Sequence, residues 1–286
     1  MRTMETTQPV IFLSHGAGPS YYMSKSDNPI FAGLDKDSKA ADFLRNLKSN
    51  AKLKLPRAVL VLSAHWEEPV CTVNTATNPS LYYDYGGFPQ EMYKLQWPVP
   101  GAPEIARKVK DLLQSKGIRC NENNKRGLDH GVFVPLKLVF PEANIPVQRI
   151  LTVFQVSLLK NLKMSDHLAI GEALTDLTKE GILIIGSGFA THNGGRPGNQ
   201  VPDWALQFRK WLHDVFTNPN YTADERKNKL LSYSSEPSFS LAHMPCEHFL
   251  PLAMTCATAG YVAGKILYSE FVMQSLLNEH YIFPVS

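Results

Sequence analysis

The chain has 286 residues, 44% of them hydrophobic, with 19% charged residues and a formal net charge of +3. These values exclude a disordered or fibrous protein, and without a dense basic block they argue against nucleic-acid binding. No apolar run approaches the ~20 residues that span a bilayer, and four dispersed cysteines fit a reducing compartment. We therefore expect a cytoplasmic protein without nucleic-acid or membrane partners.

Short aliphatic runs alternate with helical patterns along the chain. We expect strands at Val10–Ser14, Ala58–Ala64, Cys71–Thr75, Val147–Val153 and Ile182–Gly188, and helices at Ser38–Leu53, Ala102–Lys116, Asp166–Lys179, Asp203–Phe216 and Phe249–Tyr261. Continuous apolar runs suit strands that are covered on both faces, and apolar residues three and four apart indicate helices. The alternation predicts an α/β fold with a central, mostly parallel sheet flanked by helices. No linker divides residues 1–286, so we expect one domain with its core at 8–285.

Three histidines follow predicted strands at their carboxyl ends. His15 directly follows Val10–Ser14, His65 directly follows Ala58–Ala64, and His192 lies just past Ile182–Gly188. Any one of them alone is more often a hydrogen-bonded core histidine than a ligand. Ligands of open α/β sheets bind at the edge where the strands end, so the three together predict a shared site there.

Two further histidines are candidates for the same pocket. His248 follows Glu247 at the start of the helical stretch Phe249–Tyr261, and His130 precedes Gly131, which permits a tight turn. Imidazole suits zinc, iron and copper, so the set is compatible with metal-assisted hydrolysis or with oxygen chemistry at non-haem Fe(II). The motifs HExxH, GxSxG, GxGxxG and GxxxxGK[ST] are all absent from the sequence. We interpret His167, His213 and His280 as structural, and His243 as equally compatible with either role.

Five motifs in consistent order resemble the class III extradiol ring-cleavage dioxygenases, and more narrowly the 4,5-DOPA extradiol dioxygenase branch. They are Ser14-His15-Gly16, Ser63-Ala64-His65-Trp66, Leu128-Asp129-His130-Gly131, Gly186-Ser187-Gly188 with His192-Asn193, and His243-x-Pro245-x-Glu247-His248-Phe249. The resemblance covers about residues 8–285. It implies a single α/β domain with a non-haem metal at the carboxyl edge of the sheet.

The resemblance also implies roles for the histidines. His15, His65 and His248 look like ligands of Fe(II), with Glu247 as a minor alternative to His248. His192 looks like the active-site base and a potential fourth ligand, and His130 looks like the acid that serves oxygen. The implied substrates are a catechol such as L-DOPA and O₂, whose two atoms both enter the ring-opened product. Phe189, where many relatives have Asn, and Met244 after His243 depart from the branch and would alter the lining of the pocket.

Aromatic residues near these motifs are candidates for stacking on a planar ring. We expect Trp66, Phe189, Tyr85 and His243 to contact the substrate, with Tyr82 and Tyr83 nearby, although ordinary aromatic packing is the alternative. Two other functions use the same histidines: a zinc-dependent hydrolase and a non-catalytic peptide-binding scaffold. Because a site with three histidines also binds Zn(II), zinc found after purification would not separate these possibilities.

Overall fold

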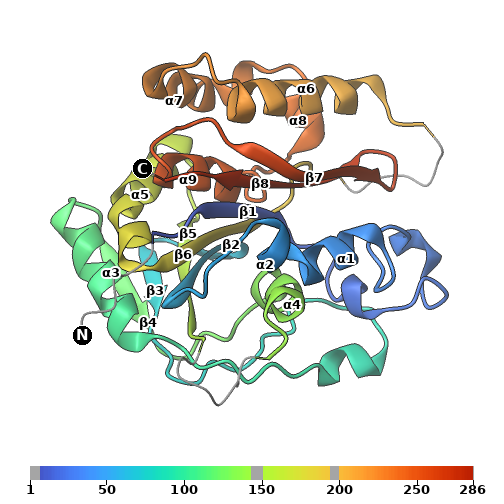
Figure 1. Cartoon of the computed structure of the whole chain (residues 1–286), viewed down its shortest axis with the longest axis horizontal. Helices are drawn as coiled ribbons and strands as arrows, with labels where there is room; N and C mark the ends of the chain where they lie inside the picture. The colour runs from blue at the N-terminus through green and yellow to red at the C-terminus, as the bar shows by residue number, and fades with distance from the viewer. Residues whose placement is uncertain (1–6, 143–150, 194–199, 286) are drawn as a thin grey trace.

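One mixed sheet organises the chain, with strands in the order β4-β3-β5-β2-β6-β1-β8-β7 (Figure 1). The structure is a computed structural model that describes residues 7–142, 151–193 and 200–285. The neighbours β5, β2, β6 and β1 run parallel, whereas β8 and β7 add an antiparallel edge. The strands are β1 (Val10–Ser14), β2 (Ala58–Glu68), β3 (Cys71–Asn74), β4 (Cys120–Asn123), β5 (Val153–Leu159), β6 (Ile182–Gly188), β7 (Lys265–Val272) and β8 (Leu276–Phe283). The predicted α/β class is confirmed.

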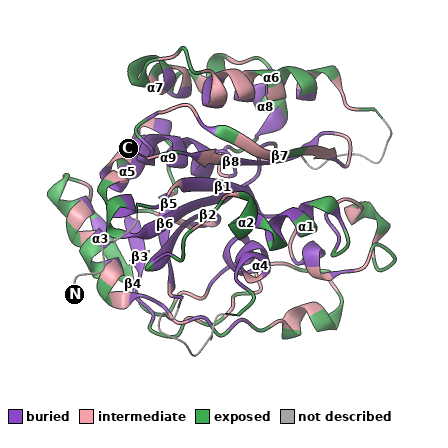
Figure 2. Cartoon of the chain, in the orientation of Figure 1, coloured by how far each residue is buried: buried purple, intermediate pink, exposed green. Residues whose placement is uncertain are grey.

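Helices cover both faces of this sheet, because alternate residues of the central strands are apolar on both sides. Val10 and Phe12 belong to one core with α3, α5 and α9, whereas Ile11 and Leu13 belong to a second core with α1 and α4. Figure 2 shows the central strands mostly buried and α6 and α7 exposed on their outer side. The helices are α1 (Lys39–Arg45), α2 (Leu47–Asn50), α3 (Pro103–Ser115), α4 (His130–Val139), α5 (Met164–Ala173), α6 (Asp203–Thr217), α7 (Ala223–Leu231), α8 (Phe239–Ala242) and α9 (Leu250–Thr258), with 3₁₀ turns that include η2 (Pro29–Phe31).

Several predicted boundaries are wrong. Strand β2 continues through His65 to Glu68, with its register against β5 interrupted between Leu62 and Glu67. Strand β5 begins at Val153, where the sequence pattern predicted a strand to end, and residues 147–150 of that prediction lie outside the described residues. The strands β4, β7 and β8 and the helices α4, α7 and α8 have no counterpart in the prediction. The edge strands β4 and β7 are only half-covered, so their mixed polar and apolar sequences lack the continuous apolar signal of the central strands. Strand β8 is buried, but Asn278, Glu279 and His280 interrupt its apolar sequence.

Two structural findings concern the helices and the cysteines considered in the sequence analysis. Within the described residues, no helix combines the length and the apolar character needed to cross a bilayer. The four cysteines are free and buried, and Cys71 and Cys120 are register partners on β3 and β4.

Candidate functional site

Histidines from separate parts of the chain meet where the central parallel strands end. Strand β6 lies between β1 and β2, and its last residues pair with Ser14 and Ser63. His15 follows β1 and donates its backbone N–H to the Gly188 carbonyl at 3.1 Å. His248 comes from the segment before α9, which packs so closely that a Cβ at Gly188 would lie 2.1 Å from the His248 carbonyl oxygen. A glycine at the end of β6 is therefore what admits His248 to this edge.

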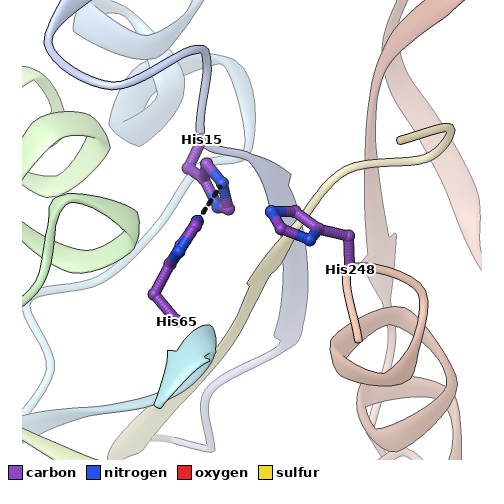
Figure 3. Close-up of side chains that lie close together, drawn as sticks. All are labelled: His15, His65 and His248. Carbon is purple, nitrogen blue, oxygen red and sulfur yellow. Dashed lines mark hydrogen bonds between the residues drawn. The ribbon is translucent and has the colours of Figure 1, made fainter. Parts of the chain in front are cut away.

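The rings of His15, His65 and His248 surround one point (Figure 3). One nitrogen of each ring lies within 4.8 Å of those of the other two, and the Nε2 atoms of His15 and His65 are 3.1 Å apart. The ring centroids are separated by 4.8 to 5.2 Å. His15 and His248 are buried and His65 is half-buried, so the three nitrogens converge in a place with little access to water.

A partner stands beside the Nδ1 atom of each of these rings. Ser187 Oγ lies 3.0 Å from His15 Nδ1 and donates its own proton to the Gly131 carbonyl, so it accepts a hydrogen bond from His15. Glu247 Oε1 accepts from His248 Nδ1 at 2.8 Å, and Asp84 Oδ2 lies 3.6 Å from His65 Nδ1. Such partners fix the tautomer and orientation of metal-binding histidines. With Nδ1 facing these partners, Nε2 is the atom that each ring has left to offer to a cation.

The electrostatic environment keeps the three rings neutral. Burial, followed by the neighbouring histidines, lowers the pKa of His15 and of His248 well below the ordinary value. Burial and His130 lower the pKa of His65 to about 3, against an opposing contribution from Asp84. Metals bind deprotonated imidazole, so no proton has to be displaced from these rings at neutral pH. The donor set therefore fits a cation such as a divalent transition metal.

His130 stands beside this cluster and is anchored by Asp84. Asp84 Oδ1 accepts from the backbone N–H of His130 at 2.8 Å and lies 2.9 Å from its Nδ1. Burial raises the pKa of Asp84, but the hydrogen bond and charge of His130 outweigh it, so the net pKa is lowered. The His130 ring centroid lies 4.0 Å from that of His65. One carboxylate thus faces both His65 and His130.

His192 occupies the outer side of the cluster. Its ring stacks on His248 with centroids 3.6 Å apart and planes at 8°, and its Nδ1 lies 3.5 Å from Glu247 Oε1. Burial and then His130 lower its pKa, although 46% of its side chain is exposed. Burial raises the pKa of Glu247. Glu247 groups with His192 and His248, whereas His15 and His65 group with His248 without Glu247.

A cavity of about 300 Å³ opens onto the cluster. Its described lining consists of His15, Gly16, Ala17, Gly18, Phe31, His65, His130, Phe189, His192, Asn193, His248, Met273 and Leu276. Phe189 belongs to this lining, with its ring 6.1 Å from that of His15 in an edge-on arrangement. Gly16, Ala17, Gly18 and Phe31 of the described lining come from the loop at residues 16–37, whereas none of its members comes from residues 82–102.

Three residues expected to contact the substrate do not line this cavity. Trp66 is adjacent to His65 on β2 and is buried on the other face of the strand, where its indole N–H donates to Glu68. Tyr85 donates its hydroxyl to the Met92 carbonyl, as part of a cluster of aromatic rings behind His130. His243 donates from Nε2 to the Ala190 carbonyl and packs against Phe208, Phe239 and Phe249.

The remaining histidines, His167, His213 and His280, are outside the described lining of the cavity and make polar contacts elsewhere. His167 accepts the Leu159 N–H and donates to the Lys163 carbonyl. His280 accepts the Ser14 N–H, and His213 pairs with the buried Glu279 at 2.9 Å. Sequence reasoning also missed residues that matter here. Asp84 carries no local signal because its partners are distant in sequence, and Met273 and Leu276 belong to an unpredicted hairpin.

Comparison with known proteins agrees with this arrangement. Residues 9–283 match the model of the family described as the catalytic LigB subunit of aromatic ring-opening dioxygenase. The chain belongs to this family. It is therefore an extradiol ring-cleavage dioxygenase, a class of non-haem iron enzymes that act on an aromatic substrate and O₂.

Curated relatives cover most of the chain. A 4,5-DOPA dioxygenase extradiol of Beta vulgaris is 38% identical over 91% of this chain and 90% of its own length. The dioxygenase tasH of Hapsidospora irregularis is 35% identical over 90% and 80%, and a 4,5-DOPA dioxygenase extradiol of Escherichia coli is 30% identical over 86% and 83%. A crystal structure of an uncharacterized Escherichia coli K12 protein has the same fold, with a TM-score of 0.73, 23% identity, and coverage of 97% of this chain and all of the other.

Proposed function

We propose that this dioxygenase uses Fe(II) held by His15, His65 and His248 to open the ring of a catechol. The observation that carries the proposal is the convergence of three imidazole nitrogens within 4.8 Å of one another, each ring with a partner beside Nδ1. Three histidines leave coordination positions open. Bound ferrous iron would supply those positions to the catechol and O₂ and pass electrons between them.

His192 is the group we assign as general base. Its lowered pKa keeps the imidazole neutral near pH 7, so Nε2 is able to take a proton from a catechol hydroxyl. Glu247, 3.5 Å from Nδ1, would stabilise the imidazolium that results. The stack of His192 on His248 also makes His192 the potential fourth ligand.

His130 is the group we assign as acid. Its Nδ1 proton is engaged by Asp84, which leaves Nε2 to hold the proton needed when the O–O bond breaks. Asp84 also faces His65, so a single carboxylate would orient one metal ligand and the acid. Phe189 would bound the substrate ring on the side of His15.

The substrate we propose is a catechol, with L-DOPA as the first compound to test because several relatives are named for it. The test is oxygen uptake by protein reconstituted with Fe(II) and ascorbate. We expect one O₂ consumed per catechol, with both atoms of ¹⁸O₂ in the ring-opened product. Protein loaded with Zn(II) is the matched control and should consume no oxygen.

The alternatives give different results in the same assay. A zinc-dependent hydrolase would turn over an ester or amide with Zn(II) and ignore catechols. A peptide-binding scaffold would take up metal and bind without turnover. Absence of catechol-dependent oxygen uptake by iron-loaded protein, across L-DOPA, catechol and alkylcatechols, would contradict the proposed function.

A further inference from the structure

The cavity has two chemically distinct sides. The histidines form one, and Phe31, Met273 and Leu276, called here the apolar wall, form another. Among the described residues that line the cavity, the histidines are the only titratable groups. Asn193 is the other polar side chain in that lining, and its amide nitrogen donates to the Leu241 carbonyl at 2.6 Å. The apolar wall thus presents an uncharged surface to the part of a bound molecule that does not contact the histidines.

The part of the apolar wall that carries Phe31 is held in place by close packing. Phe31 in η2 stacks on Phe88, with ring centroids 5.7 Å apart and planes at 20°. A Cβ at Gly18 would lie 2.9 Å from the Phe88 ring, and a Cβ at Gly33 would lie 2.8 Å from Val272 Cγ1. Both glycines have positive φ, and a side chain at either position would displace its neighbour, Phe88 or Val272. The loop carrying Phe31 is thereby pressed against the end of β7.

Met273 and Leu276 come from the tip of the β7–β8 hairpin. The two strands remain paired to Val272 and Leu276. Between them, Met273 and Gln274 adopt φ values of 49° and 67°, a left-handed conformation that costs free energy in residues other than glycine. Backbone strain of this kind persists where the surroundings enforce it, and it is concentrated at ligand sites.

A single threonine joins this tip to the histidine side. Thr191, the neighbour of His192, donates from Oγ1 to the Ser275 carbonyl at 2.6 Å and accepts the Leu277 N–H at 2.7 Å. The hairpin tip is thus fixed relative to the proposed base. An apolar surface held in register with a catalytic side chain is suited to positioning the non-reacting part of a substrate.

We propose that the apolar wall receives the ring substituent of the catechol, that the preferred substrates carry an uncharged apolar substituent, and that Met273 determines this preference. The inference rests on the proposed function and narrows its substrate class. A zwitterionic side chain placed here would lose its water without gaining a charged partner among the described residues of the apolar wall, whereas an alkyl group gains from each buried carbon. A methionine adapts its shape to different alkyl groups. A cavity of 300 Å³ lies at the small end of ligand pockets, which fits one ring with a short chain.

The first part of the test compares catechols with matched tails. We expect kcat/KM for 4-propylcatechol to exceed that for 3-(3,4-dihydroxyphenyl)propanoate and for L-DOPA by about tenfold or more. Unsubstituted catechol measures the reaction without a tail. A wild-type enzyme that favours L-DOPA over 4-propylcatechol would overturn the inference.

The second part changes the hairpin tip. Relative to kcat/KM for unsubstituted catechol in the same variant, Met273→Lys should lower kcat/KM for 4-propylcatechol about tenfold and raise it for the propanoate. Met273→Leu should retain the wild-type order. Gln274→Lys is the matched control, because it adds the same charge at the adjacent left-handed residue, which is outside the described cavity lining. Equal effects of Met273→Lys on all three compounds, or the same change of order in Gln274→Lys, would overturn the inference.

Binding measurements separate this inference from the proposed function. Phenols cannot form the catecholate chelate and are not cleaved. The two phenols 4-propylphenol and 3-(4-hydroxyphenyl)propanoate differ only in the tail, so the difference in their affinities, measured by calorimetry, reports the contribution of the apolar wall. We expect about tenfold tighter binding of 4-propylphenol, and loss of that difference in Met273→Lys. That result without any oxygen uptake would support the apolar wall while contradicting the proposed function. Turnover of catechols together with equal affinities for the two phenols would support the proposed function while contradicting the apolar wall as the site of the substituent.

Discussion

The histidine cluster and the apolar wall face the same cavity but are built in different ways. The cluster stands at the ends of the central parallel strands, and its rings are held by Ser187, Glu247 and Asp84. The apolar wall comes from a loop and from the tip of an edge hairpin, and is held mostly by packing. From this difference we infer that substitutions at the ends of the central strands affect the reaction with every substrate, whereas substitutions in the apolar wall change the preference among substrates.

The largest effect is expected from removing a ring that we assign to the metal. His15→Ala and His65→Ala should lose stoichiometric iron and lower kcat/KM by at least ~10³-fold for every catechol, more than the 10–100-fold typical of outer partners. The uniform loss across substrates contrasts with the selective effect expected at Met273. Iron content measured by mass spectrometry, with His167→Gln as the control for a buried histidine elsewhere, checks the assignment. Full iron content in both alanine variants would refute it.

The next effect separates proton transfer from metal binding within the cluster. His192→Gln should slow kcat by about 10²-fold, the usual contribution of a general base, because no neutral imidazole remains to take the catechol proton. Single-turnover oxygen uptake and iron content measure the two properties separately. Wild-type turnover in this variant would remove His192 from the mechanism.

A smaller effect is expected behind His248. Glu247→Gln keeps an acceptor for Nδ1 but removes the charge, so metal affinity should fall by about 10- to 100-fold. Competition with a chelator measures this affinity. Glu68→Gln is a suitable control, because Glu68 accepts from the Trp66 indole away from the cluster. Equal affinities in the two variants would mean that Glu247 does not support His248.

A separate effect concerns the acid stability of the metal-free protein, which requires no substrate or metal to be measured. Burial lowers the pKa of His15, His65 and His248 in the folded chain, to about 3 for His65. Unfolded histidines titrate near 6.5, so between these values the unfolded state binds more protons. The free energy of unfolding should therefore fall as the pH is lowered from about 6.5 toward 3. Urea titrations across this range check the sign, and a stability that rises toward acid would contradict it.

The parts that could be predicted from sequence are those with a continuous local signal. The apolar runs of β1 and β6 predicted the first and last residues of both strands correctly. The positions of His15 and His192 after these runs indicated that both lie at the same edge of the sheet. β5 was misplaced because apolar residues continue on both sides of Val153. Asp84 could not be found, since its contacts with His65 and His130 depend on tertiary structure.

The hairpin that carries Met273 could not be predicted either, because its sequence lacks the local signals of a strand and of a turn. Strand β7 alternates only weakly between buried and exposed residues. Its turn holds Met273 and Gln274 at positive φ without the asparagine or glycine that usually marks such a turn. The part of the apolar wall that comes from this hairpin could therefore not be predicted from the sequence.

The position of a bound metal ion tests most directly whether His15, His65 and His248 are its ligands. Anomalous diffraction at the iron edge from crystals loaded anaerobically with Fe(II) should show one ion bonded to Nε2 of His15, His65 and His248. The Nδ1 atoms should keep their contacts with Ser187, Asp84 and Glu247. Iron bound elsewhere, or bound without any one of these three rings, would contradict the account.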